Sequence, residues 1–196
     1  WYRNEWLEEG VVATAWRGRA YACYPLYARM NQRNRNGMEG PPICLVHNVA
    51  RWGYGNLVET FRALGGRCYG GGEAPDGLIT HRKAMELLSS AQCMVHLKVG
   101  DTVGYAVVEA MASAVPFVCT PHYINETRLH DLLEPGKTCE VFDPFSPTKA
   151  SLDLQAILRH FADPVVNARY GEAARDRLRK VMWNPHNKEH LDGWED

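Results

Sequence analysis

Two carboxylates in residues 98–116 (KVGDTVGYAVVEAMASAVP) have the residue types and the spacing to do chemistry. Asp101 lies in a loop after an apolar run, and Glu109 lies among Ala, Val and Met on the helix predicted to follow. A buried carboxylate is costly unless it is hydrogen-bonded. Glu109 therefore either caps a backbone amide or pairs with an arginine, or it accepts hydrogen bonds from the hydroxyl groups of a ligand.

The spacing of the two carboxylates favours a ligand. At about 1.5 Å per helical residue, Asp101 and Glu109 lie roughly 10 Å apart along the helix. Two hydroxyl-bearing groups joined by a diphosphate span a gap of that order. The helix start between them, with Gly104 permitting close approach, offers free N–H groups and a positive dipole end to phosphate. One helix would then hold both ends and the middle of a nucleotide sugar.

The elements that position these residues alternate along the chain after residue 42. Strands are expected at residues 43–47, 67–69, 93–97, 116–119 and 138–142, with helices near 57–64, 84–91, 103–113 and 125–133. Two more helices are expected after Ser151 and Pro164. This order predicts an α/β fold, a Rossmann-like doubly wound parallel sheet with C-terminal helices. Such sheets bind ligands at the carboxyl ends of their strands, here in the loops 48–55, 70–80, 98–103 and 120–126.

The carboxylate segment resembles the acidic-x7-Glu motif of the glycosyl transferases group 1 family, the retaining glycosyltransferases of GT-B fold. That motif typically reads E-G-F-G, three apolar residues, then L-E-A-M-A-C/S-G-x-P-V-V. Seven residues agree with it in register: Gly104, Glu109, Ala110, Met111, Ala112, Ser113 and Pro116. The flanking segments HRKAMELLSSAQCMVHL and NETRLHDLLEPGKTCEVFDP also resemble the family, and the likeness covers roughly residues 40–185.

The resemblance implies roles for particular positions. Asp101 would bind hydroxyls of the transferred sugar, and Glu109 would bind the ribose hydroxyls. Backbone amides near Gly104 and Tyr105 would meet the diphosphate, and Arg51 would neutralise the charge that grows there as the glycosidic bond breaks. The catalytic set is thus Asp101, Glu109 and Arg51, and the donor-binding set adds Asn48, Lys98, Thr102, Val103, Gly104 and Tyr105.

Some positions depart from the family pattern. The expected Lys-Gly pair reads Tyr54-Gly55, and Lys98 is the residue that would substitute for the missing cation. The first acid is Asp101 rather than Glu, and Thr102-Val103 replaces Gly-Phe. Ala114 stands where the family has glycine, which is expected to be only a packing change. Together these departures predict a divergent member.

The resemblance covers only the second half of a GT-B enzyme. We expect an interdomain remnant and entry segment at 1–42, including a first strand of the domain within residues 1–30. A nucleotide-sugar-binding domain is expected at 43–162, with a helical tail at 163–196 packed on it. An acceptor-binding domain is expected to precede the chain, which alone would be inactive.

The function expected is transfer of a hexosyl group from a UDP- or GDP-linked sugar, with retention and without metal or cofactor. Two alternatives stay open: a non-catalytic nucleotide-sugar-binding or interaction module, and a GT-B-fold sugar-nucleotide epimerase or phosphorylase. A nicotinamide dehydrogenase is disfavoured because no G-x-G-x-x-G follows the first strand of the predicted sheet.

Composition narrows the classes of partner. The formal net charge of the 196 residues is −1, which supplies no broad field for nucleic acid, and no nucleic-acid partner is expected. Peripheral membrane contact would come only through the missing half. No C-x-x-C pair and no H-E-x-x-H pattern point to a metal site. Cys44, Cys93 and Cys119 sit in apolar runs and are expected to be buried thiols of a cytoplasmic protein.

Overall fold

Five parallel strands form the central sheet of the computed structural model, which describes residues 12–16, 19–23, 38–45, 56–71, 74–98, 105–127 and 129–182. Their order is β4-β3-β5-β6-β7. The strands are short: β3 (Ile43–Leu45), β4 (Arg67–Tyr69), β5 (Met94–Val95), β6 (Phe117–Cys119) and β7 (Cys139–Val141). Every neighbouring pair is parallel, with Cys44 opposite Cys68 and Val95 opposite Val118. The Rossmann-like α/β fold expected from the sequence is confirmed.

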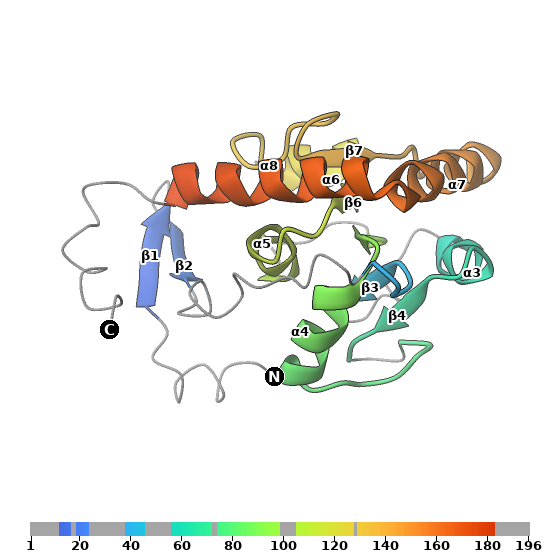
Figure 1. The fold of residues 1–196 in the computed structure, drawn as a ribbon, viewed down its shortest axis with the longest axis horizontal. Coiled ribbons are helices and arrows are strands. Elements are labelled where there is room, and N and C mark those ends of the chain that lie inside the picture. The colour runs from blue at the N-terminus through green and yellow to red at the C-terminus, as the bar shows by residue number, and fades with distance from the viewer. Residues whose placement is uncertain are drawn as a thin grey trace.

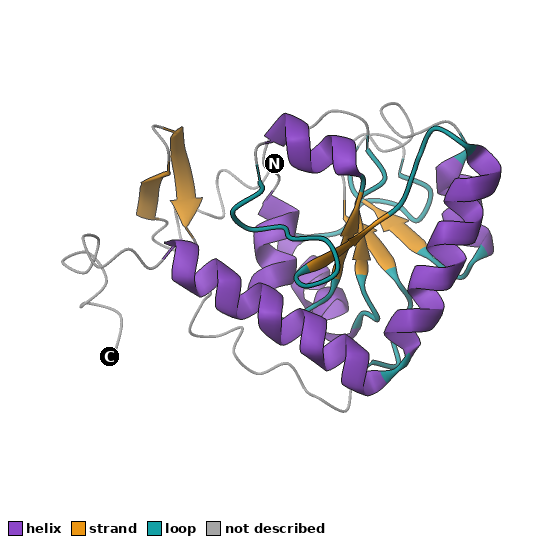
Figure 2. Ribbon diagram, turned by 90° about the horizontal axis from the view of Figure 1, so that it is seen from above, coloured by secondary structure: helices purple, strands orange, loops and turns teal. Residues whose placement is uncertain are grey.

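Helices cover both faces of this sheet (Figure 2). On the first face lie α3 (Leu57–Ala63) and α7 (Pro147–Ala162). On the second face lie α4 (His81–Ser90), α5 (Tyr105–Ala112) and α6 (Pro121–Thr127). Successive strand residues point to opposite faces, so Val95 and Val118 pack in the first core and Met94 and Phe117 in the second.

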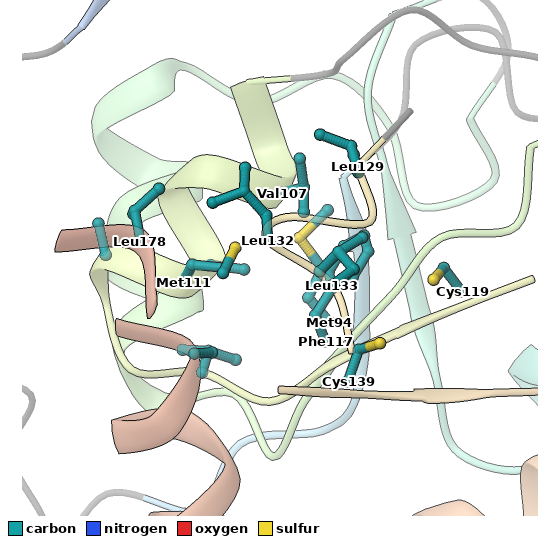
Figure 3. Close-up of a cluster of buried hydrophobic side chains, with 14 of the residues drawn as sticks. Met94, Val107, Met111, Phe117, Cys119, Leu129, Leu132, Leu133, Cys139 and Leu178 are labelled. Carbon is teal, nitrogen blue, oxygen red and sulfur yellow. The ribbon is translucent and has the colours of Figure 1, made fainter. Parts of the chain in front are cut away.

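The second core surrounds helix α5 and holds it in place by packing. Figure 3 shows Val107 and Met111 of α5 beside Met94, Phe117 and Leu178, all of them almost fully buried. Because these side chains come from the sheet and from the C-terminal helix, α5 is clamped from two sides. Its position relative to the strands is therefore set by packing rather than by helix propensity.

Five cysteines whose side chains the structure describes are buried free thiols: Cys44, Cys68, Cys93, Cys119 and Cys139. A hydrogen bond with Cys68 and burial raise the pKa of the Cys44 thiol well above its usual value. Burial and a hydrogen bond with Cys139 raise the pKa of Cys119 in the same way. Cys44 and Cys119 therefore stay protonated at neutral pH. The burial of Cys44, Cys93 and Cys119 that the sequence predicted is confirmed.

The longest helix, α8 (Pro164–Met182), packs against α7 and α5 (Figure 1). The fully buried Asn167 donates from Nδ2 to the carbonyl oxygens of Gln92, at 2.7 Å, and of Phe161, at 2.9 Å. Gln92 comes just before β5, so Asn167 ties α8 to the amino end of that strand. The division of the chain at residues 42 and 162 stays a prediction.

The N-terminal strand was wrongly placed. β1 (Val12–Trp16) and β2 (Arg19–Cys23) pair antiparallel in a two-stranded sheet of their own, with Ala15 opposite Ala20. Two strand-like runs separated by two residues, here Arg17 and Gly18, favour a hairpin over insertion into a parallel sheet.

Two helices begin earlier than expected, each because a cap was missed. α6 starts at Pro121 rather than near residue 125. The hydroxyl of Thr120, directly before this start, accepts from the amide of Tyr123 at 3.0 Å. α7 starts at Pro147 rather than after Ser151, with Ser146 as its N-cap. Proline at the first helical position has no amide to leave unpaired.

The substitution at Ala114 is more than a packing change. This residue adopts φ +53°, in the left-handed region that favours glycine. Such a conformation costs a residue with a Cβ about 1 kcal/mol or more. The expectation was wrong because the glycine of the family pattern reflects a backbone requirement of the turn between α5 and β6.

Among the described residues, no helix is both long enough and apolar enough to cross a membrane.

Candidate functional site

The strand order creates a switch point between β3 and β5. From β3 the chain moves to β4 on one side, and then returns across β3 to reach β5 on the other. Connections that leave neighbouring strands in opposite directions open a crevice at the carboxyl ends of those strands. At such a switch point a ligand site is expected among the sequence segments that follow β3 and β5. Those segments carry all the predicted catalytic and donor-binding residues except Tyr105 and Glu109 of α5.

Most of these predicted residues lie outside the described part of the chain. This is true of six of them: Asn48, Arg51, Asp101, Thr102, Val103 and Gly104. Tyr105 begins α5, and its side chain is likewise outside the description. The roles assigned to these residues stay predictions. Glu109 and Lys98 are the two whose side chains the structure describes.

Glu109 is buried and faces a histidine from another helix. Its side chain is about 8% exposed, and its Oε1 lies 3.0 Å from Nε2 of His81, the first residue of α4. His81 is equally enclosed, with 6% of its side chain exposed. The carboxylate accepts from the imidazole Nε2–H, which offsets part of the cost of burying it. The partner is therefore neither the backbone amide nor the arginine that the sequence suggested.

The second carboxylate oxygen of Glu109 is left for another donor. Within the described residues, Oε2 makes no hydrogen bond, and it is not one of the enclosed side-chain atoms that lack a partner. It therefore stays open to solvent or a ligand. A buried carboxylate with one oxygen held by the protein and one open can accept from the hydroxyl groups of a bound molecule.

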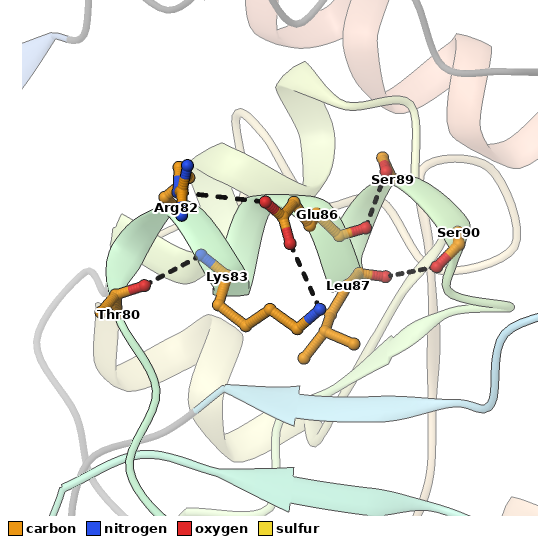
Figure 4. A network of polar contacts seen from close by, with 7 residues as sticks. All are labelled: Thr80, Arg82, Lys83, Glu86, Leu87, Ser89 and Ser90. Carbon is orange, nitrogen blue, oxygen red and sulfur yellow. Dashed lines mark hydrogen bonds and ion pairs between the residues drawn. The ribbon is translucent and has the colours of Figure 1, made fainter.

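Helix α4 presents His81 inward because of how the helix begins. Thr80 is extended and accepts from the amide of Lys83 at 3.2 Å, which starts the helix at His81. His81, Ala84 and Leu88 then share the buried face. The outer face carries charge: Figure 4 shows Glu86 between Lys83, at 3.2 Å, and Arg82, at 4.0 Å.

Sequence reasoning missed His81. The available signal was the cap residue Thr80 directly before a histidine that shares helical spacing with Ala84 and Leu88. That signal predicts an inward side chain but cannot name the helix it meets.

The segment before α4 is fixed to the carboxyl end of β4 by Asp76. Its Oδ2 accepts from the amide of Cys68 at 2.7 Å, and its own amide donates to the carbonyl of Cys68 at 3.0 Å. Partial burial raises the pKa of Asp76. The hydrogen bonds from Cys68 and Arg67 and the charges of Arg62 and Arg67 outweigh that effect and hold the pKa below its usual value.

The segment after β5 also carries a stacked aromatic pair. The buried ring of His96 lies over the ring of Tyr123 on α6, with centroids 3.9 Å apart and planes tilted by 32°. His96 thus has a packing role. Lys98, two residues further on, is partly buried, and its role as a substitute cation stays a prediction. His122 on α6 is partly buried too, and His47 lies outside the described residues.

No group of three or more His, Cys, Asp or Glu side chains in the described ranges could hold a metal ion. The sequence does contain one H-x-x-x-H pattern, at His186 and His190, which lies beyond the described residues.

The sequence and the fold can be compared with those of known proteins. No protein-family model matches the chain, and no curated protein matches it. Solved structures do. TarM of Staphylococcus aureus superposes with a TM-score of 0.61 at 16% identity, over 81% of this chain and 36% of its own. The chain shares its fold with part of a glycosyltransferase.

Two further matches support the same fold. Sucrose-phosphate synthase of Thermosynechococcus elongatus has a TM-score of 0.57 at 19% identity, over 85% of this chain and 48% of its own. Anabaena HepE, solved in complex with UDP-glucose, has a TM-score of 0.55 at 14% identity, over 85% and 52%. The chain thus spans between about a third and a half of the length of each of these three structures. The fold implied by the resemblance to GT-B glycosyltransferases is confirmed.

Proposed function

We propose that this chain is the donor-binding half of a retaining, metal-independent glycosyltransferase. It binds a nucleoside-diphosphate sugar, UDP- or GDP-linked, whose hexosyl group passes to an acceptor held by a preceding domain. The observation that carries this proposal is the buried carboxylate of Glu109, open on one oxygen, on the helix that follows the switch point. The likeness of the fold to HepE, which was solved with UDP-glucose, supports it.

Each residue of the proposed site has a distinct task. Glu109 accepts from the ribose hydroxyls, and Asp101 accepts from hydroxyls of the sugar. The amino end of α5 lies between them, and its free N–H groups suit the diphosphate. When the bond from the anomeric carbon to the diphosphate oxygen breaks, the leaving nucleoside diphosphate keeps the electron pair. Arg51, together with Lys98, would stabilise that added charge.

Calorimetric titration with UDP, GDP, ADP and UDP-glucose tests the proposal. We expect one nucleoside diphosphate to bind in the micromolar to millimolar range. Glu109→Gln should weaken it by about 10- to 100-fold, since a hydrogen bond to a charged group contributes about 1.5–3 kcal/mol. The matched control is Glu59→Gln, an exposed carboxylate on α3 at the other face of the sheet.

Two results would contradict the proposal. One is that none of the four ligands binds to the chain. The other is that Glu109→Gln and Glu59→Gln bind the nucleoside diphosphate equally well while both remain folded by circular dichroism.

A further inference from the structure

We propose that His81 is a positioning residue of the donor site, which orients Glu109 so that its open oxygen recognises the ribose hydroxyls. This inference rests on the proposed function and extends it to a residue of another helix. Its starting point is the 3.0 Å contact between Nε2 of His81 and Oε1 of Glu109, both side chains being more than nine-tenths buried.

A glutamate needs such a tether because its side chain rotates about three bonds. Freezing a long side chain when a ligand binds costs affinity. A hydrogen bond to one oxygen holds the carboxylate in a fixed plane before the ligand arrives, and so reduces that cost. The bond also assigns the proton: Nε2 of His81 is the donor, since an ionised carboxylate only accepts.

His81 itself is held rigidly from the backbone side. Thr80 caps α4 one residue earlier, and Asp76 fixes the preceding segment to β4 through two hydrogen bonds with Cys68. Glu109 is held by the packing of Val107 and Met111 on the same helix. His81 and Glu109 therefore both belong to helices whose positions are fixed by packing in the core.

The asymmetry of the contact distinguishes positioning from plain stabilisation. A contact that positions a ligand-binding carboxylate must hold one oxygen and leave the other accessible to the ligand. Here Oε1 is engaged, while Oε2 makes no hydrogen bond within the described residues. The imidazole thus points the free oxygen without occupying it.

The test compares binding of a nucleoside diphosphate with binding of its 2′-deoxy analogue, which lacks one ribose hydroxyl. The probe is whichever of UDP, GDP and ADP binds most tightly. In the unmodified chain the 2′-deoxy form should bind about 10-fold more weakly, the loss of one charge-assisted hydrogen bond. His81→Phe keeps a flat ring but removes the donor, and should bring the ratio near one.

Two further variants make the result specific. His81→Gln places an amide donor near the position of Nε2 and should restore part of the discrimination. Arg82→Gln, next in sequence on the exposed face of α4, should leave the ratio unchanged. If His81→Phe fails to fold, His81→Leu, which also removes the donor, takes its place and should likewise bring the ratio near one.

The outcomes separate the inference from the proposed function. A chain that binds no nucleoside diphosphate overturns both. Discrimination that is lost in Glu109→Gln but intact in His81→Phe overturns the role of His81 alone. Equal weakening of both ligands in His81→Phe, with the ratio preserved, shows a structural role and also overturns it.

Discussion

Gly171 of α8 lies directly against the carbonyl oxygen of Ala114, so closely that a Cβ at position 171 would be 1.9 Å from that oxygen. Ala114 is the residue with left-handed backbone in the turn between α5 and β6. Only a residue without a side chain lets the helix approach the turn this closely. The contact anchors α5 at the edge of the sheet opposite to the predicted ligand crevice.

Gly171→Ala should destabilise the chain. In an exposed helix, replacing glycine by alanine stabilises by about 0.5–1 kcal/mol. Here the added methyl meets backbone that cannot rotate away, and we expect a net loss of about 1–3 kcal/mol. Urea unfolding followed by circular dichroism measures the difference. A variant more stable than the parent chain would show that α8 does not pack on Ala114 as described.

Asn167→Asp should be among the most damaging single-atom changes in the chain. The amide of Asn167 donates to two backbone carbonyl oxygens in a fully buried place. A carboxylate there would place its oxygens, which only accept hydrogen bonds, against two carbonyl oxygens that also only accept. We expect this to lower the free energy of unfolding by about 3 kcal/mol or more.

The matched control for this change is Asn125→Asp on the exposed surface of α6. Surface substitutions of that kind usually stay within about 0.5 kcal/mol. Thermal unfolding at neutral pH compares the two variants. Similar melting temperatures for both would contradict the buried position of Asn167 on α8.

Asp76 should make stability fall in acid. Its folded pKa lies below the usual value, so the unfolded chain binds the proton more readily. The stabilisation is therefore complete above the unfolded pKa of about 3.9 and is lost as the pH falls through the lower folded pKa.

Asp76→Asn removes this contribution. The difference in unfolding free energy between the parent chain and the variant should be largest at pH 6 and should shrink toward pH 3. Urea titrations across that range measure it, with Asp176→Asn on the exposed surface of α8 controlling for loss of one charge. A difference in unfolding free energy that does not change with pH would contradict the hydrogen bonds that Asp76 accepts as an ionised carboxylate.

The sheet and most helices could be predicted because their signal is local. Buried strands such as 117–119 are short apolar runs between turn residues, and the buried faces of α4 and α7 recur at helical spacing. The starts of α6 and α7 were misplaced where one residue, Thr120 or Ser146, decides the boundary through a single hydrogen bond.

The partner of Glu109 could not be predicted because it depends on strand order. His81 is 28 residues away in sequence. β5 pairs with β3 and not with β4. Helix α4, which connects β4 to β5, therefore crosses β3 and comes close to α5. Helical spacing can indicate that each side chain faces inward, but only the three-dimensional arrangement brings the two faces together.

A change at the start of α4 should weaken ligand recognition by more than the accompanying loss of protein stability explains. Thr80→Ala removes the hydroxyl that accepts from the amide of Lys83, and the loss of an N-cap costs about 1 kcal/mol. Because His81 directly follows the cap, fraying of this first turn would also move its imidazole. We therefore expect Thr80→Ala to lower the discrimination between a nucleoside diphosphate and its 2′-deoxy analogue.

Ser146→Ala provides the control, because Ser146 caps α7 through the amide of Lys149 on the first face of the sheet. It should cost a similar amount of stability in urea unfolding. Its ratio of affinities for the two ligands should match that of the parent chain, since α7 supplies nothing to the predicted site. If the two variants lose stability equally and show the same ratio, the first turn of α4 does not position the donor site. A lower ratio in Thr80→Ala alone would tie recognition to the helix that carries His81.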